Sequence, residues 1–136
     1  MTVVVDASIA LTWCFDDEAT AETDRLFERV RDSGAIVPGL WWLELGNVLL
    51  QAERRGRINA ADVATRLDLV AELPIAEDRE TASRAWRSTL ALARSELLTT
   101  YDAAYLELAL RSGAPLATRD GELSAAAARR GVTVLP

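Results

Sequence analysis

The sequence lacks lysine and histidine, and these two absences remove several kinds of chemistry at once. All 15 basic residues are arginine, against 21 acidic residues, which gives a net charge of −6. Without histidine there is no Ser-His-Asp or Cys-His nucleophile pair and no zinc site with imidazole ligands. Without lysine there is no P-loop and no Schiff base. Carboxylates are therefore the obvious catalytic groups left to an enzyme of this composition.

Cysteine and long hydrophobic runs are also scarce. Cys14 is the single cysteine, so no disulfide forms within the chain, and a reducing cytoplasm is the expected location. The longest run without a charge, residues 33–43, is too short to span a bilayer, which takes about 20 apolar residues. Residues 1–6 lack the basic start of a secretory signal. We therefore expect no membrane partner. Half of the 136 residues are hydrophobic, enough for the core of a single domain over residues 1–136.

Short β-branched runs alternate with longer helical patterns along the chain. The predicted strands cover residues 2–5, 35–37, 74–76, 115–117 and 132–134. The predicted helices cover residues 8–15, 18–33, 40–55, 60–73, 79–95, 101–112 and 122–130. Three consecutive valines in the first strand are typical of a strand buried on both faces. The alternation predicts an α/β fold with three layers, in which helices cover both faces of a parallel sheet.

Four acidic residues fall at the carboxyl edge of that sheet, where ligands bind in folds of this kind. Asp6 and Asp120 follow predicted strands, Asp102 lies in the first turn of a helix, and Glu44 lies one turn into another. Each position also has a purely structural explanation. Asp6 and Asp120 suit helix caps or turns, and Asp102 complements the dipole of its helix.

Periodicity favours an inward direction for Asp102. It shares its helix face with Leu106 and Leu110, while Glu107 and Arg111 mark the side expected to face water. A buried carboxylate is costly unless it is paired or binds a cation. The pattern therefore predicts that Asp102 has a partner in the interior.

Glu44 lies on a narrow polar stripe with Asn47 and Gln51, between strongly apolar flanks that include Trp41 and Leu45. A solvent-facing stripe is the structural alternative. The narrowness of the stripe and its apolar flanks favour a site.

Together, four carboxylates in one crevice would repel one another unless a divalent cation neutralised them. Oxygen-only ligands favour Mg²⁺, with Mn²⁺ as a substitute, over zinc. Such an ion lowers the pKa of a bound water and stabilises charge on a phosphoryl group. In-line attack by that water on a phosphodiester then needs no histidine, no lysine and no covalent intermediate.

These segments resemble the PIN-domain ribonucleases, and in particular the VapC-type toxins of bacterial toxin–antitoxin pairs. The resemblance covers essentially the whole chain and is carried by residues 3–8, 38–49, 101–109, 115–123 and 131–134. It implies a five-stranded parallel sheet between helices and Mg²⁺-dependent endonucleolytic cleavage of RNA. It also implies inhibition by a small cognate antitoxin, and frequent formation of a homodimer.

The resemblance also implies roles for individual residues. The family's metal centre corresponds here to Asp6, Glu44, Asp102 and Asp120. The residues that support this centre correspond to Ser8, Asn47 and Thr118. We expect Asp6 and Asp102 to hold the main ion.

Two arginines near these acids have two interpretations each. Arg57 follows the Glu44 helix and Arg119 precedes Asp120, so either could contact RNA phosphates. Arg57 could instead complement a helix C-terminus, and Arg119 could simply balance the acids.

Core packing is the default expectation for the four tryptophans, at positions 13, 41, 42 and 86. One helix cannot bury both Trp41 and Trp42 in the same direction. One of these two is therefore a candidate for a dimer or antitoxin surface, where aromatic side chains are enriched.

Two other functions stay open at this point. A receiver-like signalling module also has an aspartate at a strand end, but it usually needs a lysine after its last strand, which this chain lacks. A PIN-fold protein that acts mainly by sequestering RNA or a partner is the second alternative.

Overall fold

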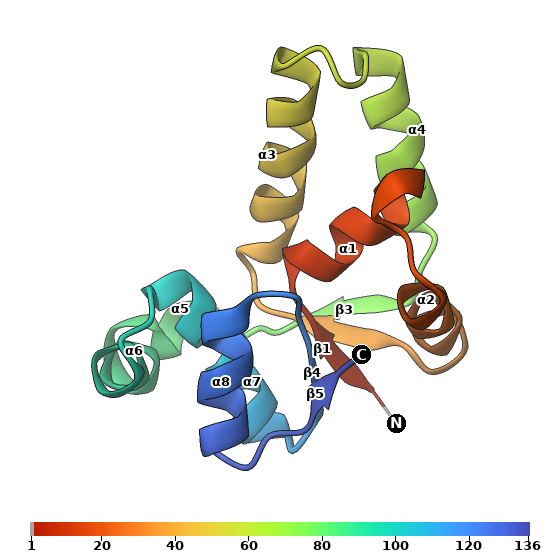
Figure 1. Cartoon of the computed structure of the whole chain (residues 1–136). Coiled ribbons are helices and arrows are strands. Elements are labelled where there is room, and N and C mark those ends of the chain that lie inside the picture. Colours follow the sequence, from red (N-terminus) through yellow and green to blue (C-terminus); the bar gives the residue numbers. More distant parts are fainter. Residues whose placement is uncertain (1) are drawn as a thin grey trace.

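A single five-stranded sheet organises the computed structural model, which describes residues 2–136 (Figure 1). The strands are β1 (Val3–Val5), β2 (Ala35–Val37), β3 (Ile75–Glu77), β4 (Leu116–Ala117) and β5 (Val134–Leu135). Their order is β3-β2-β1-β4-β5, and every neighbouring pair is parallel. The chain runs outward from β1 toward β3 and later returns to its other side at β4. The strand order therefore reverses between β1 and β4, the position where parallel sheets place their ligands.

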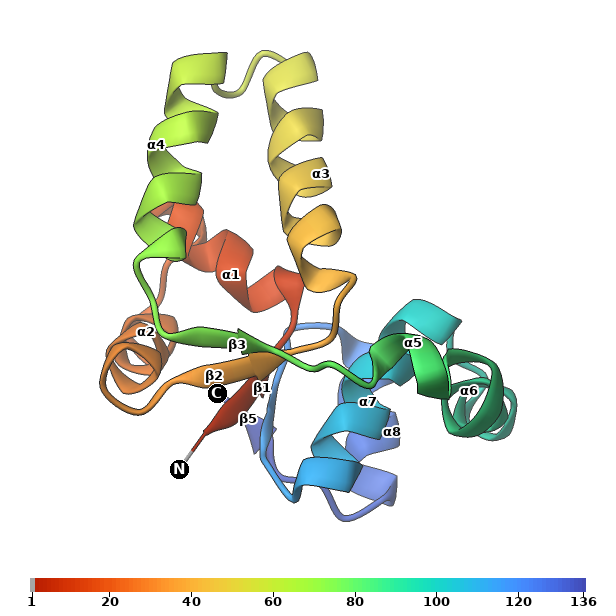
Figure 2. The ribbon, with the colours of Figure 1, turned by 180° about the vertical axis from the view of Figure 1, so that it is seen from behind.

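Helices cover both faces of this sheet (Figures 1 and 2). One group contains α1 (Ala7–Cys14), α2 (Ala21–Ser33), α3 (Trp41–Arg54) and α4 (Ala60–Ala71). The other contains α5 (Thr81–Arg84), α6 (Leu90–Glu96), α7 (Thr100–Ser112) and α8 (Gly121–Arg129). The predicted α/β fold with a five-stranded parallel sheet is confirmed. In Figure 2, α3 and α4 rise from the sheet as an antiparallel pair. Among residues 2–136, no helix is long and apolar enough to cross a membrane.

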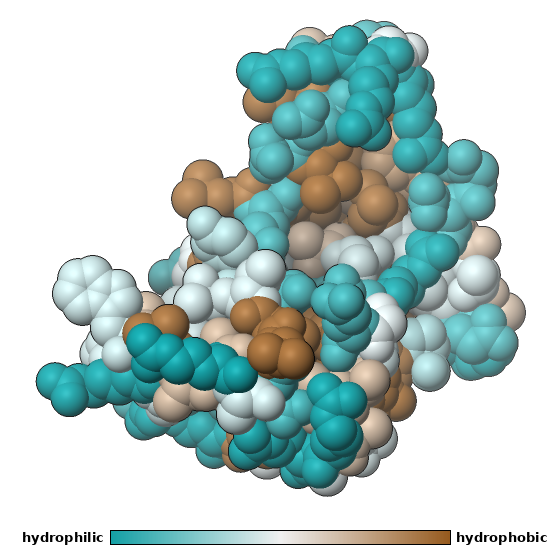
Figure 3. All heavy atoms as spheres, turned by 60° about the vertical axis from the view of Figure 1, so that its left-hand side comes forward, coloured by the Kyte–Doolittle hydropathy of each residue, from teal (hydrophilic) through white to brown (hydrophobic). Residues whose placement is uncertain are grey.

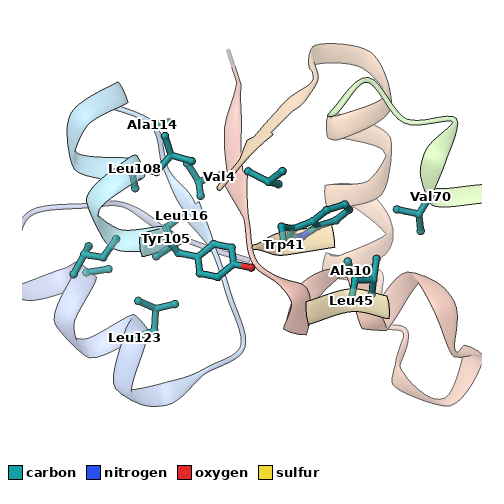
Figure 4. Packing of buried hydrophobic residues seen from close by; sticks show 14 of the residues in the cluster. Val4, Ala10, Trp41, Leu45, Val70, Tyr105, Leu108, Ala114, Leu116 and Leu123 are labelled. Atoms are coloured by element: carbon teal, nitrogen blue, oxygen red, sulfur yellow. The ribbon is translucent and has the colours of Figure 1, made fainter. Parts of the chain in front are cut away.

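The central strand β1 is buried on both faces, as its three valines predict. Val3 and Val5 pack against Leu26 of α2 on one face. Val4 belongs to a second cluster that includes Leu116 of β4 (Figure 4). A fully buried valine side chain contributes roughly 1.5–3 kcal/mol to folding. This burial fixes the end of β1, and with it the position of the residue that follows.

The helix predicted over residues 79–95 is interrupted. A π-helical turn, η2 (Ala85–Thr89), separates α5 from α6. Thr89, Leu92 and Ala93 are the buried residues of this segment, whereas Trp86 is 90% exposed. The expectation that Trp86 packs in the core is wrong, because the π turn accommodates an additional residue and changes which side chains face inward. Trp41 is buried and Trp42 is 43% exposed, in line with the opposed directions expected of neighbours on one helix.

The side of α7 that was expected to face water is covered. Glu107 is only 7% exposed, and Leu110, expected to point inward, is exposed instead. Both expectations are wrong because η2 and α6 pack against α7. The guanidinium of Arg111 neutralises this interface. It donates from Nε to Oε1 of Glu107 (2.9 Å) and from Nη2 to Oδ2 of buried Asp78 (2.7 Å). Burial would raise the pKa of Asp78, but the hydrogen bonds from Arg111, the backbone of Glu80 and Thr81, together with the charge of Arg111, outweigh it and lower that pKa.

Replacing this arginine tests the importance of the ion pairs. Arg111→Met leaves the buried carboxylate of Asp78 without a cation and leaves Glu107 with only the longer contact to Arg84 (3.5 Å), so we expect a loss of roughly 3 kcal/mol in the free energy of unfolding. Urea unfolding at pH 7 measures this loss. Arg25→Met is the matched control, because Arg25 pairs with Glu22 on the exposed surface of α2 and should contribute little. Equal stability of the two variants would contradict the prediction.

Candidate active site

Asp6 lies directly after β1, beside the point where the strand order reverses. Its side chain is buried, and both carboxylate oxygens accept hydrogen bonds. Oδ1 accepts from Oγ of Ser8 (2.6 Å) and from the backbone N of Ile9 (3.1 Å), and Oδ2 accepts from Oγ1 of Thr118. Burial raises the pKa of Asp6, and the bonds from Ser8 and Thr118 offset part of that rise. The carboxylate is therefore fixed in orientation by both α1 and the end of β4.

The loop between β4 and α8 is joined to the start of α1 by further hydrogen bonds. The backbone N of Arg119 donates to Oγ of Ser8 (2.9 Å), and the backbone N of Asp120 donates to Oγ1 of Thr118 (3.0 Å). Asp120 also caps α8, because its Oδ1 accepts from the backbone N of Leu123 (2.9 Å). Asp6 caps α1 in the same way. Capping thus holds both carboxylates in place and does not conflict with a role in a site.

Glu44 lies in the first turn of α3, and its carboxylate reaches across to α7. The hydroxyl of Tyr105 donates to its Oε1. The pKa of Glu44 is raised, first by burial and further by the charge of Asp6, while the bond from Tyr105 acts in the opposite direction. Glu44 and Asp6 are therefore close enough to sense one another's charge.

Asp102 connects all of these groups electrostatically. It lies half-buried in the first turn of α7, where its backbone N donates to Oγ1 of Thr99 (3.1 Å). Its pKa is raised to about 6, first by burial and further by the charges of Asp120, Glu44 and Asp6. The four acids at the carboxyl edge therefore form one negatively charged group.

Two residues of this region were missed by sequence reasoning. Tyr105 binds Glu44, and the charge of Glu122 also raises the pKa of Asp102. The signal for Tyr105 was its position three residues after Asp102, which places both side chains on the same side of α7. The signal for Glu122 was its place in the first turn of α8, two residues after Asp120.

Three further candidates take different positions. Asn47 is exposed, and its side chain forms no hydrogen bond within residues 2–136. The two arginines both pair with the short 3₁₀ turn η1 (Asp16–Glu18). Arg57 pairs with Asp17 (2.7 Å), and Arg119 pairs with Glu18 (3.0 Å). Glu18 also approaches Arg57 at 3.7 Å, so one carboxylate lies between the two guanidinium groups.

The four acids at the carboxyl edge have ligand atoms that suit a hard divalent cation, but their side chains do not surround a common point. Over residues 2–136, no three acidic or cysteine side chains are grouped closely enough to hold a metal ion. The donors are all oxygens, as Mg²⁺ prefers. The excess of negative charge that raises the pKa of Asp102 is what a cation would relieve.

Comparison with known proteins now identifies the family. The sequence matches the PIN domain model over residues 3–129. The chain belongs to the PIN domain family. No curated protein matches the sequence. Among solved structures, PAE2754 from Pyrobaculum aerophilum is similar, with a TM-score of 0.72 and 24% identity over 98% of this chain and 89% of that one. VapC20 from Mycobacterium tuberculosis, a toxin that cleaves the sarcin–ricin loop, has a TM-score of 0.67 and 16% identity over 92% of this chain and 95% of that one. At these identities the likeness establishes a shared PIN fold.

The raised pKa of Asp102 predicts how stability depends on pH without metal. Its folded-state pKa of about 6 lies above the ordinary value of 3.8, so the carboxyl group lowers stability progressively as the pH rises from 3.8 to about 6, and the full loss is present above that. In EDTA at pH 7.5, Asp102→Asn should therefore raise the free energy of unfolding by about 1–2 kcal/mol, after allowance for solvent screening. Denaturant unfolding measures this gain. At pH 4.5 the two proteins should differ much less, and a gain independent of pH would argue against the charge effect.

Proposed function

We propose that this PIN domain is an Mg²⁺-dependent endoribonuclease that acts as the toxin of a toxin–antitoxin pair. The observation that carries the proposal is the convergence of Asp6, Glu44, Asp102 and Asp120 at the carboxyl edge of the sheet. Membership of the PIN family supports a nuclease, and the fold shared with the toxin VapC20 supports the biological role. RNA is the proposed substrate, and the cytoplasm is the proposed place of action.

The four carboxylates would divide the work in this reaction. Asp6 and Asp102 would hold the main ion, Glu44 would contribute an oxygen to the same metal centre, and Asp120 would complete its shell or hold a second ion. When bound, Mg²⁺ or Mn²⁺ supplies a more acidic water and a positive charge beside the phosphate. Glu44, whose pKa is raised, is suited to orient the attacking water and accept its proton. Ser8 and Thr118 would keep Asp6 in the required orientation through their hydrogen bonds.

A cognate antitoxin and a second copy of the chain are the proposed protein partners. Trp42 and Leu43 are exposed near the start of α3, and Leu69 is exposed on α4. Figure 3 shows hydrophobic side chains on the protruding upper part of the molecule, which these helices form. Exposed aromatic and aliphatic side chains of this kind are typical of protein interfaces.

Removal of one carboxylate charge tests the nuclease directly. Asp6→Asn keeps the shape of the helix cap but removes the charge, so cleavage of a labelled RNA pool should fall by more than about 100-fold. EDTA should abolish cleavage by the wild-type protein, and added Mg²⁺ should restore it. The matched control is Asp32→Asn, an exposed residue at the end of α2. Full cleavage in EDTA, or full activity of Asp6→Asn, would refute the proposal. Binding of RNA without cleavage would favour the sequestering alternative.

The positions of Arg57 and Arg119 predict an effect on RNA binding, as opposed to an effect on the cleavage step. We propose that Arg57 and Arg119 contact RNA phosphates, in exchange for their contacts with Asp17 and Glu18. Arg119→Ala and Arg57→Ala should each weaken RNA binding similarly for all sequences, and each should reduce the dependence of log Kd on log salt by up to about 1. Filter binding of labelled RNA at several salt concentrations measures this slope. Arg25→Ala on α2 is the control, and an unchanged slope in both site variants would assign these arginines a structural role.

A further inference from the structure

The hydrogen bond between Tyr105 and Glu44 links the two groups of helices. Tyr105 lies on α7 and Glu44 on α3, 61 residues apart in sequence. Within residues 2–136 it is the one hydrogen bond between these two helices. Figure 4 shows the Tyr105 ring near Leu116, with its hydroxyl oxygen directed toward the side where α3 carries Trp41. The position of a carboxylate on one helix therefore depends on a side chain from the opposite group.

Core packing alone does not explain the hydroxyl group of Tyr105. The side chain is 1% exposed and lies in the same core cluster as Leu106 and Leu116. A phenylalanine would fill the same space without bringing a polar atom into the core. A buried hydroxyl is costly unless it has a partner, and Glu44 is the acceptor that this one finds. The tyrosine is thus best explained by its contact with the carboxylate.

The contact engages only one of the two oxygens of Glu44. Oε1 accepts from Tyr105, whereas Oε2 forms no hydrogen bond within residues 2–136. A phenol bound to an ionised carboxylate makes a strong, directional hydrogen bond. Rotation of the carboxylate is therefore restricted, and Oε2 stays available to the group of acids around Asp102, whose pKa Glu44 raises.

We propose that Tyr105 is a positioning residue that holds Oε1 of Glu44 and presents Oε2 to the reacting groups. This role rests on the proposed nuclease function, in which Glu44 orients the attacking water. Tyr105 itself does not touch the substrate. It links Asp102, one turn earlier on α7, to Glu44 on α3, so that the two acids keep a fixed separation.

Removal of the hydroxyl tests this role. Tyr105→Phe should lower kcat for cleavage of a labelled RNA by about 10- to 100-fold, the range typical for partners of metal-site ligands. KM for RNA should stay within about threefold, because substrate contacts are unaffected. The dissociation constant of Mn²⁺, measured by calorimetry without RNA, should rise by about tenfold. Tyr101→Phe is the matched control, since Tyr101 is exposed and donates no hydrogen bond within residues 2–136.

A double-mutant cycle separates positioning from packing. If Tyr105 acts through Glu44, then Tyr105→Phe should change Mn²⁺ affinity by less than about threefold in a Glu44→Ala background, which removes the acceptor of the Tyr105 hydroxyl. A purely structural role would lower Mn²⁺ affinity equally in both backgrounds. Thermal unfolding in EDTA checks that all variants fold. Unchanged kcat and Mn²⁺ affinity in Tyr105→Phe, or equal losses in both backgrounds, would overturn the positioning role.

The two proposals fail in different ways. If the wild-type protein binds Mn²⁺ but cleaves no RNA, the nuclease function fails, while Mn²⁺ affinity still tests the link between Tyr105 and Glu44. If cleavage requires metal and Tyr105→Phe matches the wild type, only the positioning role fails. A wild-type protein that binds no Mn²⁺ and cleaves no RNA would overturn both.

Discussion

The three hydrogen bonds that hold Asp6 determine most of the local architecture. They tie the end of β1 to the start of α1 and to the end of β4, across the point where the strand order reverses. A carboxylate at this depth is unfavourable, as its raised pKa indicates, and the hydroxyls of Ser8 and Thr118 offset part of that cost. The same residues orient the loop that carries Asp120. The edge of the sheet is thus held together by the residue that also contributes to its negative charge.

Crowding of like charge distinguishes this edge from the rest of the molecule. Elsewhere, buried acids are neutralised by arginine, as Asp78 and Glu107 are by Arg111. At the carboxyl edge, Asp6, Glu44 and Asp102 form no ion pair with an arginine within residues 2–136, and their pKa values are raised. This difference is expected of a binding site in which the ligand supplies the compensating positive charge.

The sequence predicts the fold well where local patterns and topology decide the outcome. The alternation of strands and helices predicted the parallel sheet, which the structure contains. The ends of its strands predicted that Asp6 and Asp120 lie at one edge. The predicted burial of side chains was wrong where contacts with distant segments, or an irregular turn, decide which side chains face the core. Glu107 is buried because η2 and α6 cover α7, and Trp86 is exposed because the segment contains a π turn. Neither feature has a signature in the helical periodicity of its own segment.

Partners of the acids were also only partly predictable. Ser8 and Thr118 stand beside Asp6 and Asp120 in motifs and were expected to support them, whereas Tyr105 joins a helix far away in sequence. A tyrosine on an apolar helix face is expected to pack in the core. Only the tertiary structure shows that Glu44 accepts a hydrogen bond from its hydroxyl. The contact requires the tertiary arrangement of α3 and α7, which no local spacing encodes.

The bond between Asp6 and Thr118 also has a consequence for synthesis of the chain. The two residues are 112 positions apart, and β4 is added to the sheet long after β1 has left the ribosome. At about 5–20 residues per second, the interval between them is roughly 6–20 s. During that time Asp6 lacks its partner from β4, and α8 does not yet exist. The nascent chain therefore carries an incomplete edge, and the carboxylates meet only when the last segments of the sheet are made.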